Sequence, residues 1–191
     1  MNSVKFAFVL FVATLLTACA GTNFVKPADN QLVLGSTTKA QIVAMLGEPN
    51  FKGQKVSNGE QLELMTYAYA TVGGEPVFEG VTPARSIGFL LHNGVLVGKE
   101  YTSSFKSDNT YFDPDKARSI KKGMTKSQVL ALMGKPGGEY RYPAISDKNG
   151  KALVYIFTQT RGLKSQRTIL VVELDANDIV EKSDFSKIGQ F

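Results

Sequence analysis

The chain has 191 residues, of which 43% are hydrophobic and 20% are charged. This length is enough for one or two small domains, each with a hydrophobic core. The formal net charge of +5 is spread along the chain apart from Lys121-Lys122, so it does not indicate a nucleic-acid-binding protein. It would favour contact with anionic lipid headgroups or with an acidic protein.

The first eighteen residues have the pattern of an export signal. Lys5 supplies a positive start, and residues 6–16 are apolar except for Thr14. This run is shorter than the ~20 residues that a membrane-spanning helix needs, but it suits a signal peptide. Its end, residues 16–19 (LTAC), resembles the lipobox of bacterial lipoproteins. That resemblance implies cleavage before Cys19, a thioether link from Cys19 to diacylglycerol, and acylation of the new amine by a fatty acid such as palmitate.

Cys19 is the only cysteine, so no disulfide can form within the chain. Several acyl chains on one residue would hold the protein on a membrane without a transmembrane helix. Ala20 is not the aspartate associated with retention in the inner membrane, so the lipoprotein resemblance implies an outer-membrane, lipid-anchored protein that faces the periplasm. An ordinary secretory signal that leaves a free Cys19 is the alternative.

A short tether, residues 19–26, is expected to precede a first module at residues 27–105. Within this module residues 38–49 (TKAQIVAMLGEP) specify both ends of a helix: Thr38 and Gln41 have the spacing of a capping box, and a Gly-x-Pro sequence stops the helix. A helix of about eight residues is unstable alone, so its apolar side chains must dock on a sheet. The strand-like segments that follow are 62–72, 86–91 and 95–102.

A second module is predicted at residues 113–191, after a polar linker at residues 106–112. Its helix motif, residues 125–136 (TKSQVLALMGKP), repeats the first motif, with Thr, Lys, Gln, Ala, Gly and Pro at the same places. The strand-like segments that follow are 152–160, 168–174 and 179–183. The chain is therefore interpreted as a tandem repeat.

The predicted fold class is α+β, with two tandem ααβββ modules. In each module, two short helices are expected to pack on a three-stranded antiparallel sheet. A module of about 75 residues buries only some 60% of its chain surface and is marginal alone. We therefore expect the two modules to pack into one compact unit.

The second repeat motif, in its context GMTKSQVLALMGKPG, is followed by strands that end in ELDANDIVEKSDF. This pattern resembles the SmpA/OmlA family of BamE-like lipoproteins and recurs once per module. The family has one module, whereas two tandem copies resemble the fold of β-lactamase inhibitory protein, in which a concave sheet grips a partner. Both resemblances imply a binding or scaffold protein.

No catalytic or cofactor site is predicted. His92 is the only histidine, and it adjoins the Asn-Gly of an expected hairpin turn without a nucleophile beside it. The sequence has no P-loop and no dinucleotide fingerprint, and with Cys19 lipidated no Cys/His set remains for a metal. We therefore expect no enzyme activity and no cofactor.

Two corners between a repeat helix and the next strand carry an aromatic residue beside a cation. Such a pair suits a protein-binding hot spot or a lipid-interface contact. The alternative is that the rings cover the corner and have no partner. The candidate partner-binding residues are Phe51 and Lys52 in the first module and Tyr140, Arg141 and Tyr142 in the second.

The sequence thus predicts a non-enzymatic outer-membrane lipoprotein that acts as a periplasm-facing binding or scaffold protein in envelope or β-barrel assembly and integrity. Its expected partners are the membrane, through lipidated Cys19, and an envelope protein, with anionic lipid as a further candidate and no nucleic acid. The alternative function is a periplasmic inhibitor or ligand-binding protein of the β-lactamase inhibitory protein type.

Overall fold

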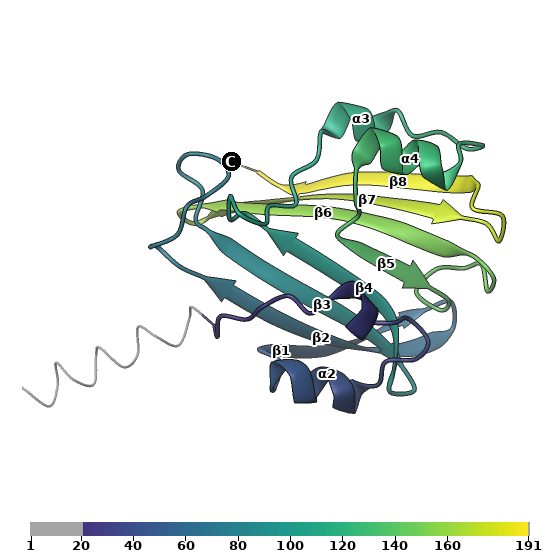
Figure 1. Cartoon of the computed structure of the whole chain (residues 1–191), viewed down its shortest axis with the longest axis horizontal. Coiled ribbons are helices and arrows are strands. Elements are labelled where there is room, and N and C mark those ends of the chain that lie inside the picture. The colour runs from purple at the N-terminus through teal and green to yellow at the C-terminus, as the bar shows by residue number, and fades with distance from the viewer. Residues whose placement is uncertain (1–20, 191) are drawn as a thin grey trace, which may run out of the picture.

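The computed structural model describes residues 21–190, which form one antiparallel sheet of eight strands with a few short helices (Figure 1). The strands follow one another across the sheet in sequence order. The strands are β1 (Phe51–Ser57), β2 (Glu60–Ala70), β3 (Ala84–His92), β4 (Val95–Ser103), β5 (Gly138–Arg141), β6 (Lys151–Arg161), β7 (Lys164–Leu174) and β8 (Val180–Gly189). The helical segments are η1 (Asp29–Gln31), α2 (Lys39–Leu46), α3 (Pro114–Arg118) and α4 (Lys126–Met133).

The predicted pair of ααβββ modules is wrong. The eight strands form a single sheet, and each half of the chain contributes four strands rather than three. The expected first helix of the first half is only a three-residue 3-10 turn, η1. The additional strands are β1, which is almost wholly exposed, and β5, which has four residues, so neither shows the alternating apolar pattern by which a strand is recognised.

The two repeated helices are built alike. In α2 the Thr38 side chain accepts a hydrogen bond from the Gln41 backbone and the Gln41 side chain accepts one from the Thr38 backbone; Thr125 and Gln128 do the same in α4. Both helices end at a glycine with φ of 76°, a conformation that side-chain-bearing residues rarely adopt. The capping chemistry written in the repeat is therefore present in both copies.

Each repeated helix is fixed at its N-terminus to the last hairpin of its own half. The Lys39 amide donates to the Gly94 carbonyl at 2.9 Å, in the β3–β4 turn. The Lys126 amide donates to the Asp178 carbonyl at 2.8 Å, in the β7–β8 turn. These bonds use N–H groups that a helix cannot satisfy internally, so each short helix is held by the sheet.

The halves join through β5. This strand pairs with β4 of the first half on one side and with β6 on the other, so the sheet has no internal edge. Gly138 lies at the centre of the join, opposite Glu100 of β4 and Val154 of β6. A Cβ there would lie 2.1 Å from the Lys99 carbonyl oxygen, so the close approach requires glycine.

All helical segments pack on one face of the sheet, where two hydrophobic cores lie. In the first core Ile42 of α2 packs with a group of strand residues that includes Met65 and Phe89. In the second core Val129 of α4 packs with a group that includes Leu153 and Val172. Met65, Phe89, Leu153 and Val172 belong to one cross-strand row, so both cores occupy the same side.

Residues 21–28, which precede η1, have no regular secondary structure, but they lie against the sheet. A Cβ on Gly21 would lie 2.0 Å from the Ala68 carbonyl oxygen of β2, and the Lys26 ammonium lies 5.0 Å from the centre of the Tyr101 ring. Within residues 21–190 no helix is long and apolar enough to cross a membrane. The predicted signal peptide and Cys19 lie outside the described residues.

Candidate binding face

The face of the sheet opposite the helices is concave; we call it the open face. Glu100 of β4 forms an ion pair across this face with Arg167 of β7, with 2.7 Å between Oε1 and Nη2. The Tyr140 hydroxyl of β5 donates a hydrogen bond to the same carboxylate. Contacts between strands that are not neighbours in the sheet require the sheet to curl toward this side. The curl also buries Val154 and Ile156 of β6.

One end of the open face is filled by the protein itself. Leu62, Leu90 and Val97 form a small core there, against which Tyr140 packs. The loop between β5 and β6 covers this end and is held by the Asn58 side chain, which donates to the Pro143 carbonyl at 2.9 Å. Little room for a partner remains at this end.

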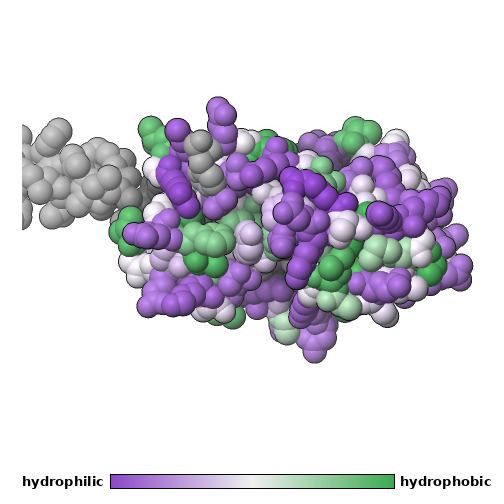
Figure 2. Space-filling model, turned by 90° about the horizontal axis from the view of Figure 1, so that it is seen from above, coloured by the Kyte–Doolittle hydropathy of each residue, from purple (hydrophilic) through white to green (hydrophobic). Residues whose placement is uncertain are grey.

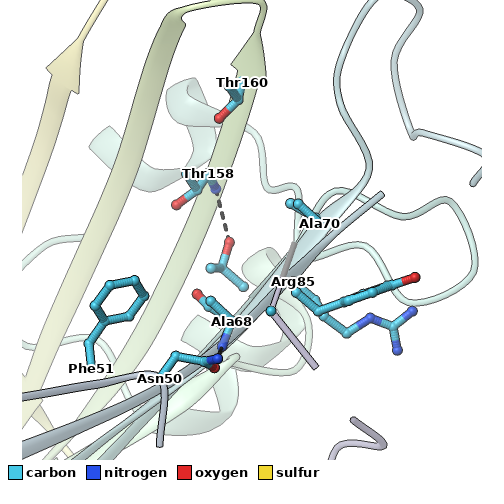
Figure 3. Close-up of a pocket in the computed structure, with 12 residues that line it drawn as sticks. Asn50, Phe51, Ala68, Ala70, Arg85, Thr158 and Thr160 are labelled. Atoms are coloured by element: carbon cyan, nitrogen blue, oxygen red, sulfur yellow. Dashed lines mark hydrogen bonds between the residues drawn. The ribbon is translucent and has the colours of Figure 1, made fainter. Parts of the chain in front are cut away.

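The other end of the open face contains a pocket of roughly 440 Å³. Figure 3 shows Phe51 and Asn50 on one side of it and Thr158 and Thr160 on another, while the Arg85 guanidinium points away from them. Small side chains dominate the lining: Ala68, Ala70, Ala84, Ser86, Thr102, Thr158 and Thr160. The Thr158 amide of β6 donates a hydrogen bond to the Thr102 hydroxyl of β4 at 2.9 Å. This bond joins the two strands where they form the wall of the pocket. A pocket of this size and lining can receive a side chain or short loop of a partner.

The first predicted corner is split between the two faces of the sheet. Phe51 lies at the start of the edge strand β1, is 65% exposed and lines the pocket. Lys52 is paired opposite Met65, on the helix-covered face, and its ammonium forms an ion pair with Glu48 at 2.8 Å. Only Phe51 of this pair faces the pocket.

The second predicted corner is split in the same way and lies at the opposite end of the sheet. Tyr140 is half-buried on the open face, where burial and the Glu100 carboxylate raise the pKa of its hydroxyl far above the ordinary value. Arg141 is exposed on the helix-covered side, and its guanidinium donates to the Leu34 carbonyl at 3.4 Å. Tyr142 precedes Pro143 through a cis peptide bond and lies beneath the Lys148 ammonium, 5.4 Å from the ring centre. The structure therefore does not bring the two predicted corners together.

A groove on the helix-covered face separates the helices of the two halves. It consists of two adjoining hollows of about 430 and 500 Å³ that share Asp29, Lys99, Lys126, Glu139 and Leu153. A hydrogen bond from Lys135 at 2.6 Å lowers the pKa of Asp29. Lys99 is buried, and its ammonium donates to the Leu32 carbonyl at 2.9 Å. Asp29 and Glu139 are both within 4.0 Å of the Lys99 ammonium, so these three charges are paired within the protein, and we interpret the groove as a seam between the halves.

Residues 21–190 contain no cluster of three or more His, Cys, Asp or Glu side chains that could hold a metal ion. His92 lies next to the Glu60 carboxylate, with 3.1 Å between the ring nitrogen and the oxygen. No catalytic hydroxyl is bonded to this ring in the described part of the chain.

Sequence reasoning missed the cross-face pair of Glu100 and Arg167 and the run of small residues around the pocket. The run does have a signal, because Thr66, Ala68 and Ala70 alternate with Met65, Tyr67 and Tyr69 in β2. Alternation places each set on its own face, and a face of small side chains has room for something else. The ion pair of Glu100 and Arg167 has no such signal in the sequence, since the contact depends on how far the sheet curls.

Comparison with known proteins relates the second half of the chain to one family. Residues 109–184 match the family model of the outer membrane protein assembly factor BamE domain. Among curated proteins no sequence matches the chain. A solved structure described as a "putative beta-lactamase inhibitor protein" from Streptococcus mutans is similar with a TM-score of 0.42 and 15% identity, over 83% of this chain and 91% of that chain.

Proposed function

We propose that this chain, whose residues 109–184 carry a BamE domain, is a non-enzymatic binding or scaffold protein of the outer membrane. It is anchored by lipidated Cys19, faces the periplasm and holds an envelope protein during β-barrel assembly or in the upkeep of envelope integrity. The family match carries this proposal.

The binding surface that the geometry supports best is the pocket end of the open face. Within residues 21–190 no helix covers this face, and its pocket of roughly 440 Å³ is lined mainly by small side chains. Phe51 at its rim is 65% exposed, and a large ring beside a pocket is typical of a hot spot. We therefore retain Phe51 as the leading partner contact. Arg141 and Tyr142 remain candidates for a second contact, whereas Tyr140 is engaged by Glu100 and Lys52 by Glu48.

Site-specific photocrosslinking tests this surface. A photoreactive phenylalanine analogue replaces Phe51 in one variant and Lys52 in another, because these neighbours point to opposite faces of β1. We expect crosslinks from position 51 to an integral outer-membrane protein or its assembly factors, and few from position 52. Equal crosslinking from both positions, or none from either, would contradict the assignment of the open face.

Intact mass and membrane fractionation of the wild type and of Cys19→Ala test the anchor separately. We expect the wild type to carry the added acyl mass and to fractionate with the outer membrane, and the variant to lose both properties. An unmodified, soluble wild type would remove the lipoprotein part of the proposal.

A periplasmic inhibitor or ligand-binding protein is the second candidate function, since a concave face that no helix of residues 21–190 covers could also hold a loop of a soluble hydrolase. The crosslinking experiment separates the two candidates. Stoichiometric crosslinking of a soluble hydrolase to position 51 would favour the inhibitor. Crosslinking of a membrane barrel component would favour the scaffold.

A further inference from the structure

The two ends of the sheet differ in the chemistry of their turns. At one end lie the β1–β2 turn at Asn58-Gly59, the β3–β4 turn at Asn93-Gly94 and the β7–β8 turn at residues 175–178 (DAND). These are the polar residues that turns ordinarily use. At the other end, which we call the apolar end, the β2–β3 loop presents Val72 and the β6–β7 hairpin presents Leu163.

Val72 and Leu163 are both fully exposed, with relative accessibilities of 100% and 105%. Leu163 occupies a two-residue hairpin tip after Gly162, where a polar residue would serve the turn equally well. Neither side chain contributes to a core, so folding does not explain their presence. Single exposed apolar residues are common on protein surfaces, but two fully exposed tips at one end of the molecule can enter an apolar surface together.

The two tips belong to one end of the molecule. The Thr82 amide of the β2–β3 loop donates to the Thr160 carbonyl at 2.8 Å, next to the β6–β7 hairpin. Figure 1 shows both connections at the end of the sheet where the described chain begins, and Figure 2 shows hydrophobic side chains among the hydrophilic ones at this end.

The described chain begins at the same end as the two tips. Gly21 lies against Ala68, near the end of β2, and it lines the pocket there. Cys19 precedes it by two residues, which span at most about 7 Å when extended. An acyl group on Cys19 would therefore hold the apolar end close to the bilayer.

The charge of the hairpin also fits a membrane surface. Arg161 and Lys164 flank the apolar tip, and residues 158–172 contain no acidic residue. Cations beside an inserted apolar side chain suit the phosphates of lipid headgroups. Glu75 and Glu79 of the β2–β3 loop lie at this end too, and Glu75 is paired with Lys106 at 3.6 Å.

We propose that the apolar end is a membrane-contact surface, in which Leu163 and Val72 enter the bilayer interface while Lys164 contacts lipid phosphates. This inference rests on the proposed membrane anchoring, to which it adds a defined orientation. The long axis of the sheet then points away from the bilayer, and the pocket lies close to the lipid surface.

Depth-dependent fluorescence quenching tests the orientation. Since Cys19 is the only cysteine and is blocked when lipidated, a cysteine introduced as Leu163→Cys can be labelled alone with an environment-sensitive fluorophore. Asn177→Cys is the matched control, because it lies in an exposed turn at the other end of β7. Each lipidated full-length variant is reconstituted into vesicles of phosphatidylethanolamine and phosphatidylglycerol that contain spin-labelled lipid.

We expect a blue-shifted emission and at least twofold stronger quenching at position 163 than at position 177. Equal quenching at the two positions, or none at either, would overturn the orientation while the acyl mass on Cys19 still supports the anchor. A blue shift at position 163 that persists without vesicles would assign the tip to a second copy of the chain and would also overturn it.

If intact mass shows no acyl group on Cys19, the proposed anchor is wrong. The Leu163→Cys and Asn177→Cys variants are then made in a protein that also carries Cys19→Ser, labelled, and mixed with the same vesicles. Quenching at position 163 alone would then support the membrane contact without the anchor. The absence of quenching would overturn it. Vesicles of phosphatidylcholine alone, in which we expect weaker quenching, test the contribution of the Lys164 charge.

Discussion

Two tyrosines hold the same place in the two halves. Tyr67 donates its hydroxyl to the Gly47 carbonyl at 2.8 Å, and Tyr155 donates to the Gly134 carbonyl at 2.9 Å. Each acceptor belongs to the glycine that ends a repeated helix, where backbone carbonyls lack partners within the helix. A side chain from the sheet thus completes the end of each helix.

Removal of one such hydroxyl should destabilise the protein slightly. We expect Tyr155→Phe to lower the free energy of unfolding by about 0.5–1.5 kcal/mol, the usual net contribution of a hydrogen bond. Tyr69→Phe is the control, because Tyr69 stacks on Phe105 and its hydroxyl donates no hydrogen bond in the described part of the chain. Chemical denaturation measures both changes, and an equal loss in the two variants would contradict the assignment.

Burial of the same tyrosines predicts a loss of stability in alkali. Burial raises the pKa of Tyr67 and of Tyr155 to about 12, above the ordinary value of 10.0. The unfolded chain therefore ionises first, and the free energy of unfolding falls as the pH rises from about 10 to 12. Denaturation across this range should show a shallower fall in Tyr67→Phe/Tyr155→Phe than in the wild type. Parallel curves would argue against these groups as the cause.

At the scale of single elements, capping chemistry was readable from the sequence and strand pairing was not. Helices α2 and α4 begin after a threonine and end at a glycine, and these signals lie within a few residues of the helix that they define. The four-residue strand β5 exists because β4 and β6 hold it on both sides. That support comes from distant parts of the chain, so no local pattern reports it.

The same difference between local signals and distant contacts explains which of the candidate partner-binding residues are exposed. Both corners follow a Gly-x-Pro and looked equivalent in sequence. Phe51, however, begins β1, which has a free edge and remains exposed, whereas Tyr140 lies in β5, which is paired on both sides under the curled sheet. The position of a strand within the sheet, which the sequence does not report, decides which corner is available to a partner.

The close approach at β5 can be tested with a pair of glycines. A Cβ at Gly138 would lie 2.1 Å from the Lys99 carbonyl oxygen, a backbone atom that cannot turn aside. A Cβ at Gly53 in β1 would meet only the Leu64 Cβ, at 3.9 Å. We expect Gly138→Ala to lower the free energy of unfolding by about 1–3 kcal/mol and Gly53→Ala to leave it nearly unchanged. Similar thermal midpoints for both variants would show that the join is not tight.

At the scale of the whole molecule, the halves share more than a sheet. Val77 and Phe78, from the first half, pack against the core of the second. Glu100 reaches Arg167 across the open face, and Asn58 holds the loop at Pro143. Each contact is lost if one half unfolds alone, which couples the stability of one half to the other.

Matched core substitutions test this coupling, because Ile42 and Val129 occupy equivalent places in the two helices and both are fully buried. Ile42→Ala should cost about 2–5 kcal/mol, and Val129→Ala should cost less because it removes fewer atoms. If the sheet unfolds as one unit, each substitution lowers a single midpoint and reduces hydrogen-exchange protection in both β2 and β7. Two separate transitions, with each substitution confined to its own half, would mean that the continuous sheet joins two independently stable units and that β5 transmits little between them.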